Sequence, residues 1–87
     1  MSEIQKVRNA ISEKVDQLLE ATEITTSDFL GEKVTVIPAA ASQFVVQAFG
    51  ETFGRLDRGQ IAKELKSAAW LWIKERLDSP AEALEVL

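Results

Sequence analysis

The stretch IAKELKSAAWLWIKERL, residues 61–77, contains both tryptophans of the chain and its longest apolar run, AAWLWI. At about 100° per residue, one side of this stretch is apolar, which predicts a helix with one face in the core. That face holds Ile61, Leu65, Ala68, Ala69 and Trp72, with Ala62 and Ile73 at its margin. Residues 61–77 therefore predict the central helix of the fold.

Trp70 lies opposite the middle of this core face, Leu77 lies close to Trp70, and Leu71 projects in a third direction. Around Trp70 the predicted helix is thus apolar on nearly every side, and such helices are normally buried all round. Either another helix of the same chain covers Trp70 and Leu77, or a partner does.

The start of this helix has the strongest local signal in the sequence. Asp57 fits the N-cap and Gln60 the N3 position, while Leu56 and Ile61 fit a hydrophobic staple. These residues predict that the helix begins at Asp57.

A second helix is predicted over residues 38–53, with Pro38 at its first position. Gly54 is expected to end it as a left-handed cap. At helical spacing, one wide apolar face contains Ala41, Phe44, Val45, Ala48, Phe49, Thr52 and Leu56. This face is the predicted packing partner of residues 61–77.

Two further helices are predicted at the ends of the sequence. Ser2 and Gln5 fit a capping box that opens a helix with the apolar stripe Ile4, Val7, Ile11, Val15, Leu18 and Leu19. Near the other end, Ser79, Pro80 and Glu82 fit a second box before a short helix that offers Ala81, Leu84 and Leu87.

Residues 33–37 are rich in β-branched side chains, and Gly31-Glu32 fits a two-residue type II′ turn. Residues 26–30 and 33–37 therefore form either a hairpin or an extended loop. The fold class predicted from the whole sequence is mainly α: one domain over residues 1–87, a compact bundle of about four helices. The small β-hairpin or extended insertion lies between the first and second helices.

Composition excludes several classes of function. The chain is 46% hydrophobic and 28% charged, the balance of a folded protein. It has no cysteine and no histidine, which removes disulfides, thiolate or imidazole metal sites and His- or Cys-based catalysis. Phosphate-binding loops and acidic metal loops are absent from the sequence. We therefore expect no enzyme activity, no cofactor and no metal.

The longest apolar run has six residues, far fewer than the roughly 20 needed to cross a bilayer. The first residues form an acidic amphipathic segment without the apolar core of a signal peptide. We expect a cytoplasmic protein without membrane association.

Charge is unevenly distributed along the chain. The net charge is −4, but residues 55–76 contain six basic and three acidic residues, a net charge of +3. One hypothesis is that this segment binds nucleic acid through Arg55, Arg58, Lys63, Lys66 and Lys74. Against it, no turn follows Leu65 to begin a recognition helix, and the chain as a whole is acidic.

The favoured hypothesis is a non-enzymatic protein–protein interaction or self-assembling accessory or adaptor protein. Its predicted binding patch consists of Trp70, Leu71, Ile73 and Leu77 with Lys66 and Lys74 at the rim. The basic rim favours an acidic protein or another copy of the chain, whose first helix offers Glu13, Asp16 and Glu20. The alternative is that the chain's own first helix, or its Leu84 and Leu87 tail, covers Trp70.

Overall fold

A computed structural model describes residues 2–87 and has an α+β fold. Along the chain it forms α1 (Glu3–Leu18), β1 (Thr25–Phe29), β2 (Glu32–Pro38), β3 (Gln43–Ala48), β4 (Glu51–Asp57), α2 (Arg58–Arg76) and α3 (Ala83–Val86). Two 3-10 turns, η1 (Ala40–Ser42) and η2 (Pro80–Glu82), precede β3 and α3. The prediction of a mainly α bundle of about four helices is therefore wrong.

The four strands form one antiparallel sheet in the order β1-β2-β3-β4. Two-residue turns join β1 to β2 and β3 to β4: Leu30-Gly31 in the first hairpin and Phe49-Gly50 in the last. A longer connection that contains η1 joins β2 to β3. All four turn residues have positive φ, between 53° and 77°, as type I′ turns require. The first hairpin falls where the sequence placed it, but its turn begins one residue earlier than Gly31-Glu32.

Residues 38–53 form no helix apart from the short turn η1. In β3 the side chains alternate instead: Phe44, Val46 and Ala48 lie on one side, and Val45 and Gln47 on the other. The strand thus separates Val45 from Phe44 and Ala48, which the predicted helical face had placed together. β-Branched and aromatic side chains favour strands, and pairing with β2 on one side and β4 on the other stabilises them. Pairing with β2 and β4 therefore stabilises a strand in a segment whose apolar residues also fit a helical period.

Gly54 is likewise not a helix cap, because it lies within β4. A β-carbon at this position would lie 2.8 Å from Val45 Cγ2 and 3.2 Å from Val45 Cα. The register between β3 and β4 shifts beside it, between Phe44 and Val46. Glycine is used here for close approach of two strands at a bulge.

The predicted starts of both long helices are confirmed. Ser2 Oγ accepts a hydrogen bond from the Gln5 backbone N–H at 3.2 Å, and Asp57 Oδ1 accepts one from Gln60 N–H at 2.8 Å. The Gln5 side chain does not complete the box, because its Nε2 donates to Asn9 Oδ1 at 3.0 Å.

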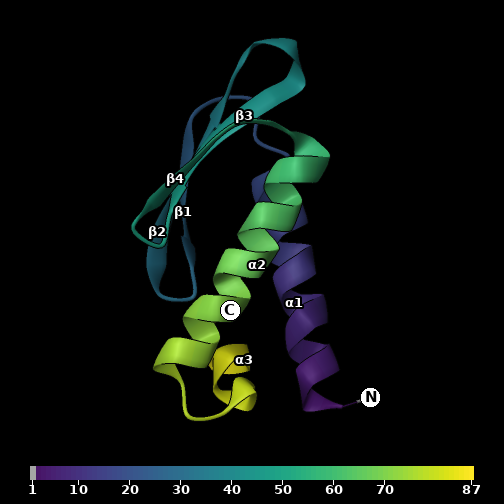
Figure 1. The fold of residues 1–87 in the computed structure, drawn as a ribbon, viewed down its shortest axis with the longest axis vertical. Coiled ribbons are helices and arrows are strands. Elements are labelled where there is room, and N and C mark those ends of the chain that lie inside the picture. Colours follow the sequence, from purple (N-terminus) through teal and green to yellow (C-terminus); the bar gives the residue numbers. More distant parts are fainter. Residues whose placement is uncertain (1) are drawn as a thin grey trace.

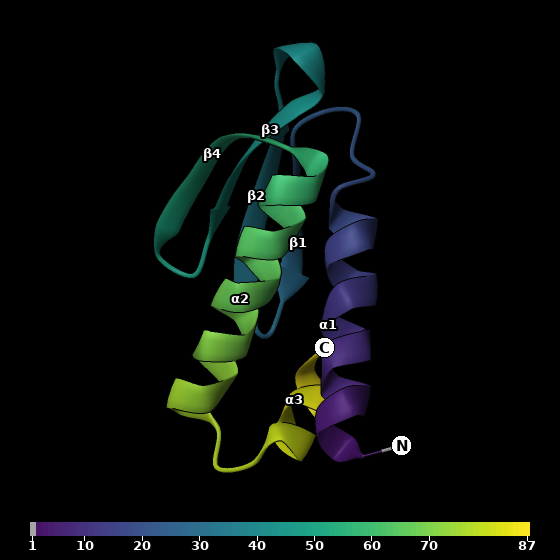
Figure 2. The same cartoon turned by 45° about the vertical axis from the view of Figure 1, so that its right-hand side comes forward.

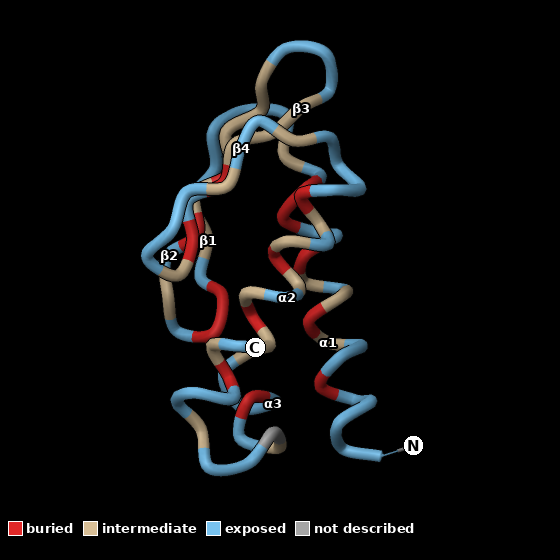
Figure 3. The backbone as a smooth tube through the Cα atoms, in the orientation of Figure 1, coloured by how far each residue is buried: buried red, intermediate tan, exposed pale blue. Residues whose placement is uncertain are grey.

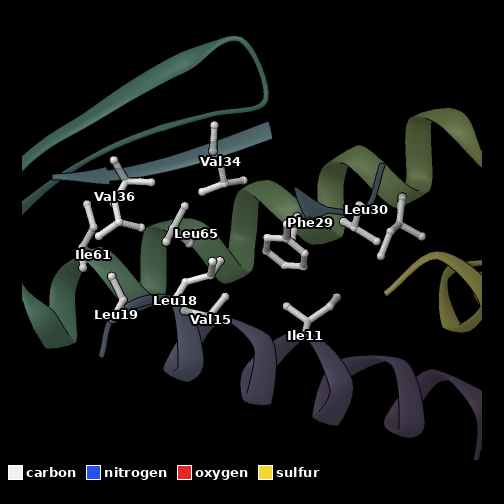
Figure 4. Close-up of a cluster of buried hydrophobic side chains, with 14 of the residues drawn as sticks. Ile11, Val15, Leu18, Leu19, Phe29, Leu30, Val34, Val36, Ile61 and Leu65 are labelled. Carbon is white, nitrogen blue, oxygen red and sulfur yellow. The ribbon is translucent and has the colours of Figure 1, made fainter. Parts of the chain in front are cut away.

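Both long helices pack on one face of the sheet, and α3 lies at the end where α1 begins and α2 ends (Figures 1 and 2). Figure 3 shows buried positions on the long helices and on the strands that they face. The close-up in Figure 4 shows these side chains meeting, among them Val15 and Leu18 of α1, Leu65 of α2 and Val34 of β2. Buried on α2 are Ile61, Leu65, Ala69 and Ile73, so the core face is centred closer to Ile73 than the sequence indicated.

The other face of the sheet is mostly polar, with Ile37 and Val45 paired on it. Thr26 and Thr35 share a hydrogen bond between their hydroxyls at 2.9 Å, and Lys33 Nζ lies 2.7 Å from Asp28 Oδ1. Neither long helix packs over this face in Figures 1 and 2. The molecule thus has a helical surface and a sheet surface, with the core between them.

Candidate functional site

A groove runs along the outer surface of the helix pair, between α1 and α2. Its volume is about 440 Å³ and it opens to solvent. We call it the α1/α2 groove, and its lining residues are Arg8, Asn9, Ile11, Ser12, Lys66, Ser67 and Trp70. Because α1 and α2 are held by the core on their inner faces, the groove is built on two rigid elements.

Trp70 forms one wall of the α1/α2 groove. Its indole is partly buried and packs against the core, while the Arg8 guanidinium carbon lies 5.2 Å from a ring centroid. A guanidinium at this distance is attracted by the electron-rich face of the ring. The first helix therefore covers part of Trp70 and leaves the rest accessible from the groove.

The chemistry of the groove is one-sided. Arg8 and Lys66 supply cations from opposite walls, Ser12 and Ser67 supply hydroxyl groups, and Ile11 and Trp70 supply apolar surface. Among the residues that line it, none carries a carboxylate. Such a site favours a ligand that combines carboxylate groups with apolar surface.

The structure divides the predicted binding patch among different environments. Ile73 is buried in the core at 2% exposure, and Leu77 packs against the core cluster. Leu71 is 54% exposed, and Lys74 is exposed without lining the groove. Of the six predicted residues, Trp70 and Lys66 come together in the α1/α2 groove.

The five residues of the nucleic-acid hypothesis are also spread out. Arg55 is exposed on β4, and Arg58 Nη2 donates to the Asp16 carbonyl at 3.3 Å at the end of α1. Lys63 and Lys74 are exposed on α2, outside the groove that Lys66 lines. Lys63, Lys66 and Lys74 share one face of α2 at helical spacing, whereas Arg55 and Arg58 lie apart from it.

The sequence reading missed the α1 wall of the groove, Arg8, Asn9 and Ser12, together with Ser67 on α2. Arg8 and Ser12 are four residues apart in α1, and the buried Ile11 lies between them in the sequence. This spacing places both on one flank of the helix. The sequence offered the first helix as one possible cover for Trp70, but it could not give which flank of that helix lies beside the indole.

The second tryptophan, Trp72, packs within the protein and does not line the groove. Trp72 stacks on Phe49 with ring centroids 5.3 Å apart, and the Arg76 guanidinium lies 3.3 Å from its ring centroid. Phe49 in turn contacts Phe29 at 5.6 Å. Trp72 therefore joins α2 to the turn of the second hairpin and to the core.

Asp28 and Lys33 form the ion pair on the sheet surface. The hydrogen bond and charge of Lys33 hold the pKa of the Asp28 carboxyl below its ordinary value, and Lys14 adds a smaller effect in the same direction. Residues 2–87 contain no cluster of carboxylates arranged to hold a metal ion. Within the same range, no helix combines the length and apolar character needed to cross a bilayer.

Comparison with known proteins found no matching family model, no matching curated protein and no matching solved structure.

Proposed function

We propose that this protein is a non-enzymatic adaptor or accessory protein that binds an acidic segment of another protein in the α1/α2 groove. The observation that carries the proposal is the composition of the lining, in which Arg8 of α1 and Lys66 of α2 lie in one groove with Trp70 and no lining residue carries a carboxylate. Tryptophan and arginine are the side chains most enriched at the energetic centres of interfaces, and the groove brings Trp70 and Arg8 together. The proposal places the protein in the cytoplasm.

A protein partner is favoured over nucleic acid by the same geometry. Arg8 already occupies one face of the Trp70 ring, so a nucleobase must displace it to stack there. A carboxylate can instead bind Arg8 and Lys66 while an apolar side chain contacts the exposed edge of the indole. The net charge of −4 also opposes long-range attraction of a polyanion.

The test uses Trp72→Phe as a background, because this substitution leaves Trp70 as the single indole and keeps an aromatic ring against Phe49. An acidic helical peptide of glutamate and leucine is titrated against it, with a lysine-and-leucine peptide as the charge control. We expect the acidic peptide alone to change the fluorescence of Trp70. Its affinity should fall as salt is added, because salt screens exposed charges.

A matched pair of double variants locates the site. Arg8→Gln with Lys66→Gln should weaken binding by roughly tenfold or more, since charge-assisted hydrogen bonds are lost. Lys63→Gln with Lys74→Gln removes the same charge from exposed positions of α2 that do not line the groove, and it should weaken binding much less. Equal weakening by the two pairs would reject the groove, and tighter binding of a single-stranded oligonucleotide would favour the nucleic-acid hypothesis.

A further inference from the structure

The two edges of the sheet differ in how they are protected. At the β4 edge, the register with β3 shifts between Phe44 and Val46, and Arg55 adds an exposed charge. Bulges and edge charges are the usual means of preventing another strand from pairing. β1, by contrast, pairs with β2 in an unbroken register from Thr25 to Phe29 and contains neither proline nor lysine. Its one charged residue, Asp28, is paired with Lys33 of β2. The β1 edge is the unprotected one.

The turn fixes which backbone groups of β1 face outward. In a hairpin with a two-residue turn, the residues that flank the turn, Phe29 and Glu32, form a hydrogen-bonded pair, and the bonding alternates from there. Thr25, Ser27 and Phe29 therefore bond to β2. The N–H and C=O groups of Thr26 and Asp28 point away from the sheet and are available to a fifth strand.

A cleft of about 380 Å³ lies next to β1, between α1, the loop that follows it and the helical face of the sheet. Thr25 and Ser27 line it from β1, and Lys14, Gln17 and Glu20 line it from α1 and its end. Val36 of β2 also lines it, so the cleft lies over the sheet and not beyond its edge. A strand paired with β1 would therefore extend the sheet beside this cleft.

We propose that β1 pairs antiparallel with β1 of a second copy of this chain, giving a two-fold symmetric dimer with a continuous eight-stranded sheet. The register centred on Ser27 pairs all five residues of β1 and sets the free groups of Thr26 against those of Asp28. It also keeps the two Asp28 carboxylates from facing each other. This surface is separate from the α1/α2 groove and does not depend on its function.

Charge on the cleft fits a second copy. With a two-fold axis at Ser27, the clefts of the two copies run in opposite directions. Lys14 of one copy then lies on the same side as Glu20 and Glu23 of the other, which is a favourable arrangement of charge. Asp28 is already paired with Lys33, which reduces its repulsion toward a neighbour. Ile24, which is 68% exposed just before β1, comes next to the second copy's turn at Leu30.

The chain has no cysteine, so one introduced thiol reports the pairing directly. In the proposed register Ser27 faces its own copy in a non-hydrogen-bonded pair, with Cα atoms about 4.5 Å apart, which a disulfide can bridge. Ser27→Cys should cross-link under mild oxidation at least about tenfold faster than Ser79→Cys, an exposed control far along the chain, because pairing raises the effective concentration.

Light scattering on the unmodified chain provides the second readout. The expected molar mass is twice 9.6 kDa, falling toward 9.6 kDa on dilution. Equal cross-linking of Ser27→Cys and Ser79→Cys would overturn the proposal. So would a mass of 9.6 kDa at every concentration, and so would a dimer in which Ser27→Cys gains no advantage, since that dimer must use another surface.

Discussion

At position 54 the difference between glycine and alanine is one β-carbon, and the structure has no room for it. That atom would lie 2.8 Å from Val45 Cγ2 and 3.2 Å from Val45 Cα, so the β3 backbone must move as well as the side chain. We expect Gly54→Ala to lower the free energy of unfolding by about 1 to 3 kcal/mol. The midpoint of urea unfolding measures this change.

Gly59→Ala is the matched control. A β-carbon at Gly59 makes only an ordinary contact of 3.6 Å with Asp57 Oδ1, and Gly59 lies within α2. Because alanine favours helices, this variant should be more stable by up to about 1 kcal/mol. A Gly54→Ala protein as stable as Gly59→Ala would show that β3 and β4 do not approach each other as described.

The Asp28–Lys33 pair gives a prediction about acid. Because the pKa of Asp28 is lowered in the folded state, the pair stabilises that state at pH values above the pKa of Asp28 in the unfolded chain. This contribution is lost as the pH falls through the folded-state pKa. In Lys33→Met, the pKa of Asp28 should rise toward its ordinary value, as followed by NMR titration of the carboxyl carbon. Lys74→Met is the control, and equal titration of Asp28 in both variants would contradict the assignment.

Among the elements, the helix starts differ in how much of the core depends on them. Asp57 caps α2, whose buried residues Ile61 and Leu65 follow within two turns, whereas Ser2 caps the exposed first turn of α1. Asp57→Ala should cost about 1 kcal/mol of stability, measured by urea unfolding, because the Gln60 N–H loses its acceptor. Ser2→Ala should cost less. A larger loss of stability in Ser2→Ala than in Asp57→Ala would mean that the folded state depends more on the start of α1 than on the start of α2.

The same elements show how far the sequence could predict the fold. Caps are local signals, so Ser2 and Asp57 located both long helices correctly. The first hairpin was also visible, because its strands are β-branched around a glycine. The second hairpin was missed because Phe44, Val45, Ala48 and Phe49 satisfy a helical period, and only pairing with β2 and β4 makes the alternating period dominant.

The candidate site was predicted only in part for a related reason. Trp70 and Lys66 lie on the helix that the sequence singled out, and both line the groove. Ile73 was placed at the margin of the core face and in the binding patch, because the core face was centred too far toward Trp72; the structure buries it in the core. Arg8 and Ser12 come from a helix distant in sequence, and their position beside Trp70 is a tertiary contact that no local pattern encodes.

For the whole molecule, the fold separates two surfaces that a small chain can use independently. The helical surface has the α1/α2 groove with its two cations and Trp70, while the sheet has an unprotected edge at β1. No residue of β1 lines the groove, so a partner bound in the groove leaves the β1 edge accessible. We therefore expect a dimer to present two grooves, one on each copy.

The most direct measurement of the binding proposal is a map of backbone and indole N–H chemical shifts during titration with the acidic glutamate-and-leucine peptide. The account predicts the largest changes at Arg8, Ser12, Lys66 and Ser67 and at the Trp70 indole N–H. Lys63, Lys74 and the strands should change little. Changes concentrated on β1 or on the exposed side of α2, with Trp70 unaffected, would contradict the assignment of the α1/α2 groove as the binding site.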